Sequence, residues 1–188
     1  MTNQSSHPEP SRGRALVIHE SMFGNTAAIA DVVAGTLHQA GIAVEVVPVS
    51  DAPPAAELDV DLVLLGAPTH ALSLSRASTR EDAVRQGAPA ERAATGLREW
   101  LTDARDHPPT STTAVALFDT RAAGARHLPG SAARKAARLA KGAGFRPVLP
   151  PHSSYVEGIS GPLLDGEIDR ARAWASEVAA TVVARSRA

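Results

Sequence analysis

The chain has 188 residues, 44% of them hydrophobic, and its 19 basic residues nearly balance its 20 acidic ones. This length and apolar content are typical of one domain with a single core, and the near-neutral charge with only 3% aromatic residues argues against nucleic-acid binding. Because the chain has no cysteine, disulfides, zinc–thiolate sites, iron–sulfur clusters and cysteine nucleophiles are excluded.

The first residues, MTNQSSHPEPSRG, are rich in serine, proline and histidine, and we predict a disordered tail at residues 1–13 before a domain at residues 14–188. This stretch lacks the apolar core of a signal peptide, and no later segment has the roughly 18 consecutive apolar residues that cross a bilayer. We therefore expect a cytoplasmic protein with no membrane partner.

Short β-rich runs then alternate with helical patterns. The strands are predicted at residues 16–18, 44–47, 62–65, 114–118 and, more weakly, 147–149. The helices are predicted at about residues 25–40, 91–105, 131–142 and 164–185. Alternation of this kind supplies the crossovers that parallel strands need, and continuous apolar runs indicate strands covered on both faces. We predict a doubly wound α/β fold: a five-stranded parallel sheet with helices on both faces.

The segment SMFGNT, residues 21–26, follows the first strand directly and opens a helix. Ligands of open parallel sheets bind outside the carboxyl ends of the strands, where a helix N-terminus offers unsatisfied N–H groups to an anion. The hydroxyls of Ser21 and Thr26, the amide of Asn25 and close backbone approach at Gly24 would wrap a terminal phosphate. The alternative is that Ser21 or Asn25 only caps the helix.

Motifs for other chemistry are missing around this turn. No GxGxxG follows the first strand and no lysine follows Gly24, so dinucleotide binding and phosphoryl transfer lack their usual parts. A nucleophile elbow needs glycine two residues either side of Ser21, where the chain has His19 and Phe23. His19 and His152 have no partner at metal-ligand spacing, so no metal site is predicted.

Three loops, taken in order, resemble those of the flavodoxin family. They are residues 21–26 after the first strand, Gly66-Ala67-Pro68-Thr69-His70 after the third and Phe118-Asp119-Thr120-Arg121 after the fourth. The resemblance spans nearly the whole chain from about Arg14. It implies the strand order 2-1-3-4-5 and FMN as cofactor, with the FMN phosphate in the first loop and the isoalloxazine ring between the other two.

The resemblance also implies which residues would hold each part of FMN. The phosphate would be held by Ser21, Phe23, Gly24, Asn25 and Thr26, where Phe23 replaces the family's usual threonine and serves only through its backbone N–H. The ring would be lined by Pro68, Thr69 and His70 on one side and by Asp119, Thr120 and Arg121 on the other. No catalytic side chain is assigned, because the flavin itself would carry the electron or hydride chemistry.

Two features depart from the family. Flavodoxins proper are strongly acidic and usually flank the ring with Trp or Tyr, whereas this chain has a net charge of -1 and no aromatic residue in 68–76 or 119–130. The ring would then lean on His70, Leu72 or Leu128, or on a second subunit. An uncovered face is also where a substrate or quinone would dock, as in the flavodoxin-like quinone reductases, which the chain also resembles.

Two further segments have open interpretations. Residues 120–146 contain seven basic residues and no acidic one, which fits either a solvated helix face or the attraction of an acidic partner or NADPH. Residues 75–83 are predicted to enter a helix with Ser78 or Thr79 as its N-cap, either as structure alone or as a lid over the flavin.

Two functions follow. The first is an FMN-binding redox protein that transfers electrons or reduces a small acceptor such as a quinone, with a redox protein or NAD(P)H as partner; whether it is an enzyme stays open. The second is a non-redox protein of the same fold that binds a phosphate-bearing ligand or a protein. The sequence does not indicate the oligomeric state.

Overall fold

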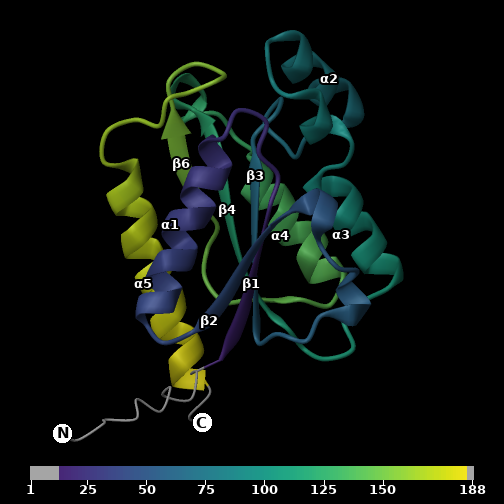
Figure 1. The fold of residues 1–188 in the computed structure, drawn as a ribbon, viewed down its shortest axis with the longest axis vertical. Coiled ribbons are helices and arrows are strands. Elements are labelled where there is room, and N and C mark those ends of the chain that lie inside the picture. Colours follow the sequence, from purple (N-terminus) through teal and green to yellow (C-terminus); the bar gives the residue numbers. More distant parts are fainter. Residues whose placement is uncertain (1–12, 186–188) are drawn as a thin grey trace, which may run out of the picture.

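The computed structural model describes residues 13–185, in which a parallel sheet lies between two layers of helices (Figure 1). The tail predicted at residues 1–13 lies outside the described residues except for Gly13. The strands are β1 Arg14–His19, β2 Ala43–Pro48, β3 Leu62–Pro68, β4 Ala114–Ala122, β5 Arg146–Pro147 and β6 His152–Val156. The helices are α1 Asn25–Gln39, α2 Ala77–Arg85, α3 Leu97–Asp106, α4 Ala132–Gly142 and α5 Glu167–Arg185.

The sheet order β2-β1-β3-β4-β5, with every pair parallel, confirms the predicted fold class and strand order. The fifth position of the sheet holds two short strands, since β5 pairs with the start of β4 and β6 with its end. Strand β5 ends at Pro147, and Pro150 and Pro151 lie in the break before β6; proline has no backbone N–H for a sheet ladder. The strand predicted at residues 147–149 is therefore cut short, and β6 was not predicted.

Helices cover both faces of the sheet, as predicted. Side chains alternate along a strand, so Leu16 and Ile18 pack into the core beneath α3 and α4, whereas Ala15 and Val17 pack beneath α1 and α5. Figure 1 shows these two helix pairs on opposite sides of the sheet. Strand β3, in the middle, is buried along all but its last residue, which explains its unbroken apolar sequence. No helix within residues 13–185 is long and apolar enough to cross a membrane.

Two helices begin later than the sequence predicted. Residues 90–93 form a separate 3-10 turn, and α3 begins only after Gly96, whose backbone is extended. Helix α5 begins after Gly166, which has a positive φ of 81°. A glycine stands at each of these starts, because glycine is about 1 kcal/mol less favourable than alanine inside a helix and readily adopts other conformations. The carboxyl ends of the strands, where the site was predicted, lie at the upper edge in Figure 1.

Replacing Gly66 with alanine should destabilise the fold. A Cβ on Gly66 of β3 would lie 2.2 Å from Cζ of Phe118 on β4, and overpacking of this kind costs about 1–3 kcal/mol. Gly35→Ala is the matched control, because nothing lies within 4 Å of its Cβ position in α1, and alanine there should add up to about 1 kcal/mol. Urea unfolding of both variants measures the difference; a Gly66→Ala protein as stable as wild type would contradict this packing.

Candidate functional site

A pocket of about 100 Å³ lies where the carboxyl ends of β1, β3, β4 and β6 meet. Of the eleven residues predicted to bind a ligand, nine line it: Ser21, Phe23, Asn25, Thr26, Pro68, Thr69, His70, Thr120 and Arg121. The other lining residues, which the sequence did not suggest, are Met22, Ala122, Val156, Gly158 and Ile159. The structure thus brings the three predicted loops together and adds a fourth, after β6.

The loop between β1 and α1 leaves a run of backbone N–H groups open. Within the described part of the chain, no acceptor contacts the N–H groups of residues 22–26. Gly24 has a left-handed backbone, with φ 91°, immediately before α1, and a left-handed residue next to a helical turn forms a concave arrangement of N–H groups that binds anions. The N-cap of α1 is Gly24, three residues after Ser21, and the Ser21 Oγ accepts a hydrogen bond from one N–H of the first turn, that of Ala27, at 3.2 Å.

Two of the predicted phosphate ligands already have partners. The Thr26 and Thr120 hydroxyls lie 2.8 Å apart and are both buried, so they join α1 to β4. Asn25 Nδ2 donates to the Ser160 carbonyl at 2.8 Å. Gly161 packs against the Asn25 amide, which a Cβ there would approach to 2.5 Å. These side chains fix the walls of the pocket, and the backbone N–H groups remain for a ligand.

Thr69 and Asp119 hold the start of α4. The Thr69 hydroxyl accepts from the Ala132 N–H at 2.8 Å and donates to Asp119 Oδ2 at 3.2 Å, and the same Oδ2 accepts from the Ala133 N–H at 2.9 Å. The Asp119 carboxylate is fully buried and does not line the pocket. A carboxylate at a helix N-terminus is stabilised by the helix dipole, so these residues place α4 beside the pocket.

Arg121 brings a buried positive charge to the pocket. Its side chain is only 5% exposed, and its guanidinium donates to the carbonyls of Ala125 and Leu128. None of the acidic residues in 13–185 forms an ion pair with it, and its Nε has no partner there. Burying a cation without an anion is costly. An anionic ligand in this pocket would relieve that cost. Burial lowers the pKa of the neighbouring His70 imidazole, which therefore stays neutral near pH 7.

Large aliphatic side chains are exposed on three loops around the pocket: Leu72 is 36% exposed, Leu128 49% and Ile159 71%. We call these three residues the aliphatic rim. Leu72 is held in a tight hairpin, in which Ala71 and Leu72 have positive φ angles of 46° and 61°. Such backbone costs about 1–2 kcal/mol per residue for a side chain other than glycine, and strain of this kind clusters at functional sites.

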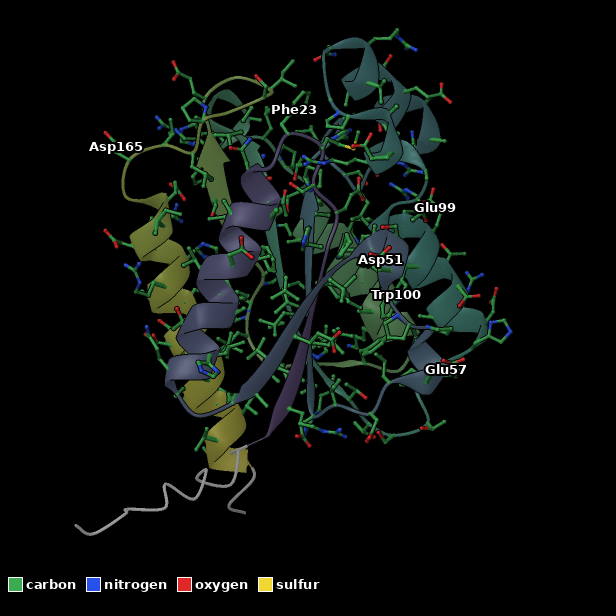
Figure 2. The ribbon with its side chains drawn as sticks, viewed as in Figure 1. Phe23, Asp51, Glu57, Glu99, Trp100 and Asp165 are labelled. Carbon is green, nitrogen blue, oxygen red and sulfur yellow. The ribbon has the colours of Figure 1, made fainter. Side chains whose placement is uncertain are left out.

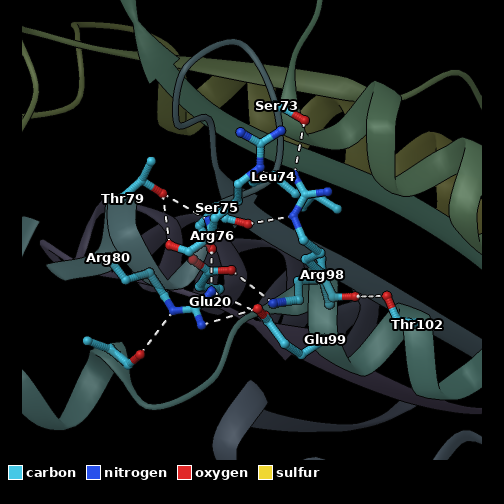
Figure 3. Close-up of polar contacts among 12 residues, drawn as sticks. Glu20, Ser73, Leu74, Ser75, Arg76, Thr79, Arg80, Arg98, Glu99 and Thr102 are labelled. Carbon is cyan, nitrogen blue, oxygen red and sulfur yellow. Dashed lines mark hydrogen bonds and ion pairs between the residues drawn. The ribbon is translucent and has the colours of Figure 1, made fainter. Parts of the chain in front are cut away.

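A buried polar network anchors the loops from below (Figure 3). Glu20, directly before the first loop, is 1% exposed and its Oε2 accepts from the Leu97 N–H at 2.9 Å. Arg80 of α2 donates to the Ser75 hydroxyl at 3.0 Å and pairs with Glu99 at 3.2 Å. A Cβ on Gly96 would lie within 3 Å of Glu20, Ser75 and Arg80. The end of β1, the loop after β3 and the start of α3 are thereby locked together.

The segment at 75–83 therefore has a structural role. Its helix is capped at Arg76, with the Thr79 hydroxyl accepting from the Arg76 N–H at 2.9 Å, rather than at Ser78 or Thr79. Arg98 of α3 also donates to the carbonyls of Leu74 and Ser75, at 2.6 and 2.7 Å. These bonds hold the segment against α3.

Larger hollows lie elsewhere. One of about 390 Å³ adjoins the other side of the first loop, lined by Ser21, Ser50 and Arg92 among others. One of about 570 Å³ lies at the opposite edge of the sheet, near Arg14 and Glu57. Figure 2 shows Phe23 near the top of the molecule and Glu57 at its lower right. Neither hollow contains the run of open N–H groups. No group of three or more metal-ligating side chains occurs within residues 13–185.

No protein-family model and no curated protein matches the sequence of this chain. Flavodoxin 1 from Bacillus cereus is a similar solved structure, with 18% identity over 87% of this chain and 95% of that one, and a TM-score of 0.62. A flavodoxin from Streptococcus pneumoniae has 18% identity over 89% of this chain and 98% of its own, with a TM-score of 0.63. The chain has the flavodoxin fold.

The fold also occurs within a longer protein. Rubredoxin oxygen:oxidoreductase from Desulfovibrio gigas has 17% identity to this chain and a TM-score of 0.61, covering 96% of this chain but 38% of that one. At such identities the likeness is one of fold. The pocket at the carboxyl ends of the strands lies where ligands of doubly wound sheets bind.

The Glu20→Gln variant tests the buried network through pH. Burial raises the pKa of the Glu20 carboxyl, against the opposing effects of hydrogen bonds from Ser75 and Leu97 and of the Arg80 charge. A raised pKa means that the fold favours the protonated acid, so the wild-type free energy of unfolding should fall as pH rises above the ordinary value of 4.5. Gln cannot ionise. Its stability advantage over wild type, measured by urea unfolding, should therefore grow with pH and then level off; an advantage that shrinks with pH would mean that Arg80 dominates.

Proposed function

We propose that the protein binds FMN at this pocket and works in electron transfer or in flavin-dependent reduction of a small acceptor. The observation that carries the proposal is the run of open N–H groups at residues 22–26, next to the buried, uncompensated charge of Arg121. Both features favour an anion. A terminal phosphate on a ligand of the flavin type satisfies them.

The residues fit the two ends of FMN differently. The pocket of about 100 Å³ is smaller than the roughly 300–1,000 Å³ of most ligand sites, so it suits a phosphate and its linker and leaves the ring outside. The aliphatic rim, Leu72, Leu128 and Ile159, offers that ring an exposed apolar surface. Bound FMN would supply the electron and hydride chemistry.

The chain's own residues would bind and orient the cofactor. The backbone of residues 22–26 would hold the phosphate, and Arg121 would add a positive charge that favours an anionic ligand. The loops at 68–76 and 119–130 have no Trp, Tyr or Phe to cover the ring. A quinone, a nicotinamide or a redox protein would therefore reach the ring directly. The flavodoxins and the oxygen:oxidoreductase that share the fold support a redox role for this chain.

The second candidate is a non-redox protein that binds a different phosphate-bearing ligand. The small volume of the pocket and the lack of an aromatic residue in the loops at 68–76 and 119–130 favour it. The two candidates differ in whether an isoalloxazine ring adds to affinity. Titrations that vary the phosphate and the ring separately distinguish them.

The phosphate assignment predicts that the apoprotein binds FMN more tightly than riboflavin. Gly24→Ala places a side chain on a backbone with φ 91°, which costs about 1–2 kcal/mol. The free loop should therefore relax away from the left-handed conformation that holds the phosphate, so FMN affinity should fall by up to about 5- to 30-fold, and riboflavin affinity should not, because riboflavin has no phosphate. Gly144→Ala is the control, since Gly144 has φ 89° with open space around it, at the far end of α4. Flavin fluorescence titration measures both; equal wild-type affinities for FMN and riboflavin would move the phosphate elsewhere.

The ring assignment predicts that Ile159→Ser weakens FMN and riboflavin alike. Ile159 is 71% exposed and lines the pocket, and losing its apolar contact with a ring should cost about 1–2 kcal/mol. Leu164→Ser is the control, an exposed leucine that follows Ile159 in the same loop but does not line the pocket. If Ile159→Ser leaves flavin affinity unchanged, or if Leu164→Ser lowers it equally, then Ile159 does not contact the ring. That result would favour the non-redox candidate.

A further inference from the structure

Charge is unevenly distributed along this nearly neutral chain. Residues 120–156 contain seven basic residues and no acidic one. The other 12 basic residues of the chain stand against all 20 of its acidic residues. A basic region within an otherwise acidic protein produces a strong local field, which steers oppositely charged partners to it.

The basic residues gather on one helix and the loop before it. Arg134, Arg138 and Lys141 are exposed and follow one another at helical spacing along α4, and Arg126 is exposed in the loop between β4 and α4. We call these four residues the basic face. The opposite side of α4 consists of alanines that are buried in the core. The charges therefore point away from the protein.

The basic face has no acidic neighbour. None of its four residues forms an ion pair with any acidic residue of the described chain, whereas exposed arginines elsewhere do, as Arg85 does with Asp82 and Arg172 with Asp169. Like charges four residues apart on a helix destabilise it by about 0.2–0.5 kcal/mol. The helix thus keeps a repulsion that a partner's carboxylates would relieve.

The basic face begins at the candidate site. Helix α4 starts beside the pocket, because the Ala132 N–H donates to Thr69, and its 11 residues extend about 16 Å away. The loop that carries Arg126 also carries Leu128 and is tied to Arg121. A protein docked on α4 would therefore lie next to the surface that we assign to the flavin ring.

We propose that the basic face docks the acidic surface of a redox protein, which exchanges electrons with the flavin. The proposal rests on the proposed function. Leu72 and Leu128 would form an apolar centre with the arginines around it, which is the usual arrangement of a protein interface. Arginine, three of the four residues of the basic face, pairs with carboxylates through two parallel hydrogen bonds. Among residues 120–156 of the described chain, no Phe, Tyr or Trp is exposed as a platform for bases.

Binding of a fluorescein-labelled poly-L-glutamate peptide of about 20 residues, followed by fluorescence anisotropy on the full-length apoprotein, tests the basic face at low and physiological salt. The Arg134→Glu/Arg138→Glu variant should bind the peptide at least about tenfold more weakly than wild type. The Arg85→Glu/Arg172→Glu variant has the same net charge change at exposed sites on α2 and α5, and it should stay within about twofold of wild type.

An equal loss in both variants would overturn the proposal, because net charge alone would then explain binding. If the protein binds a DNA duplex or phosphatidylserine vesicles more tightly than the peptide, the proposal that the partner is an acidic protein is wrong. FMN titration of the same variants separates the two proposals. Peptide binding lost in the basic-face variant with FMN affinity kept supports docking on α4. If the basic-face variant loses peptide binding, the control variant keeps it and the wild-type protein does not bind FMN, the redox role is wrong and docking of an acidic partner is supported.

Discussion

The first turn of every helix has N–H groups without acceptors in the helix, and the site follows from how three helices meet this demand at one edge of the sheet. Helix α3 is satisfied by Glu20, which accepts from the Leu97 N–H. Helix α4 is satisfied by Thr69 and Asp119. Helix α1 keeps its first N–H groups open, apart from that of Ala27, which donates to Ser21. Since buried polar groups otherwise find partners, the open terminus of α1 is where we propose that a ligand binds.

Hydrogen bonding also explains why two residues predicted to bind phosphate, Thr26 and Asn25, instead form the walls of the pocket. Thr26 bonds to Thr120, and Asn25 bonds to the carbonyl of Ser160. These bonds use the side chains to hold α1, β4 and the loop after β6 at a fixed separation. The backbone N–H groups between them are therefore held in place before any ligand binds. A site built from backbone N–H groups depends less on side-chain identity than on loop shape.

Apolar runs predicted the parallel α/β fold, and the polar turn at residues 21–26 predicted an anion site, because both are local signals. The sheet order and the other site residues came from the resemblance to flavodoxins; the order is confirmed, and nine of the eleven named residues line the pocket. The sequence pattern missed β6 and the loop containing Ile159, since the serines at 153 and 154 lack the apolar alternation of a strand and the pairing with β4 is set by distant residues. It also extended α3 back to residue 91, whereas the helix begins after Gly96, whose backbone is extended and whose neighbours Glu20, Ser75 and Arg80 leave no space for a Cβ. The capping role of Asp119 depends on how β4 and α4 meet in space, which the local patterns that predicted both elements do not specify.

How the binding energy divides between the phosphate and the ring of FMN bears on whether the protein is an electron carrier or an enzyme. Hydrogen bonds to a charged group contribute about 1.5–3 kcal/mol each, and several N–H groups at residues 22–26 are available for a phosphate. The aliphatic rim has only three exposed side chains and no stacking partner for a ring. The phosphate end would thus supply most of the affinity and leave the ring uncovered. An uncovered ring beside a basic helix suits exchange of electrons with a docked protein, and it equally admits a small acceptor, so the docking surface rather than the pocket would decide which partner is used.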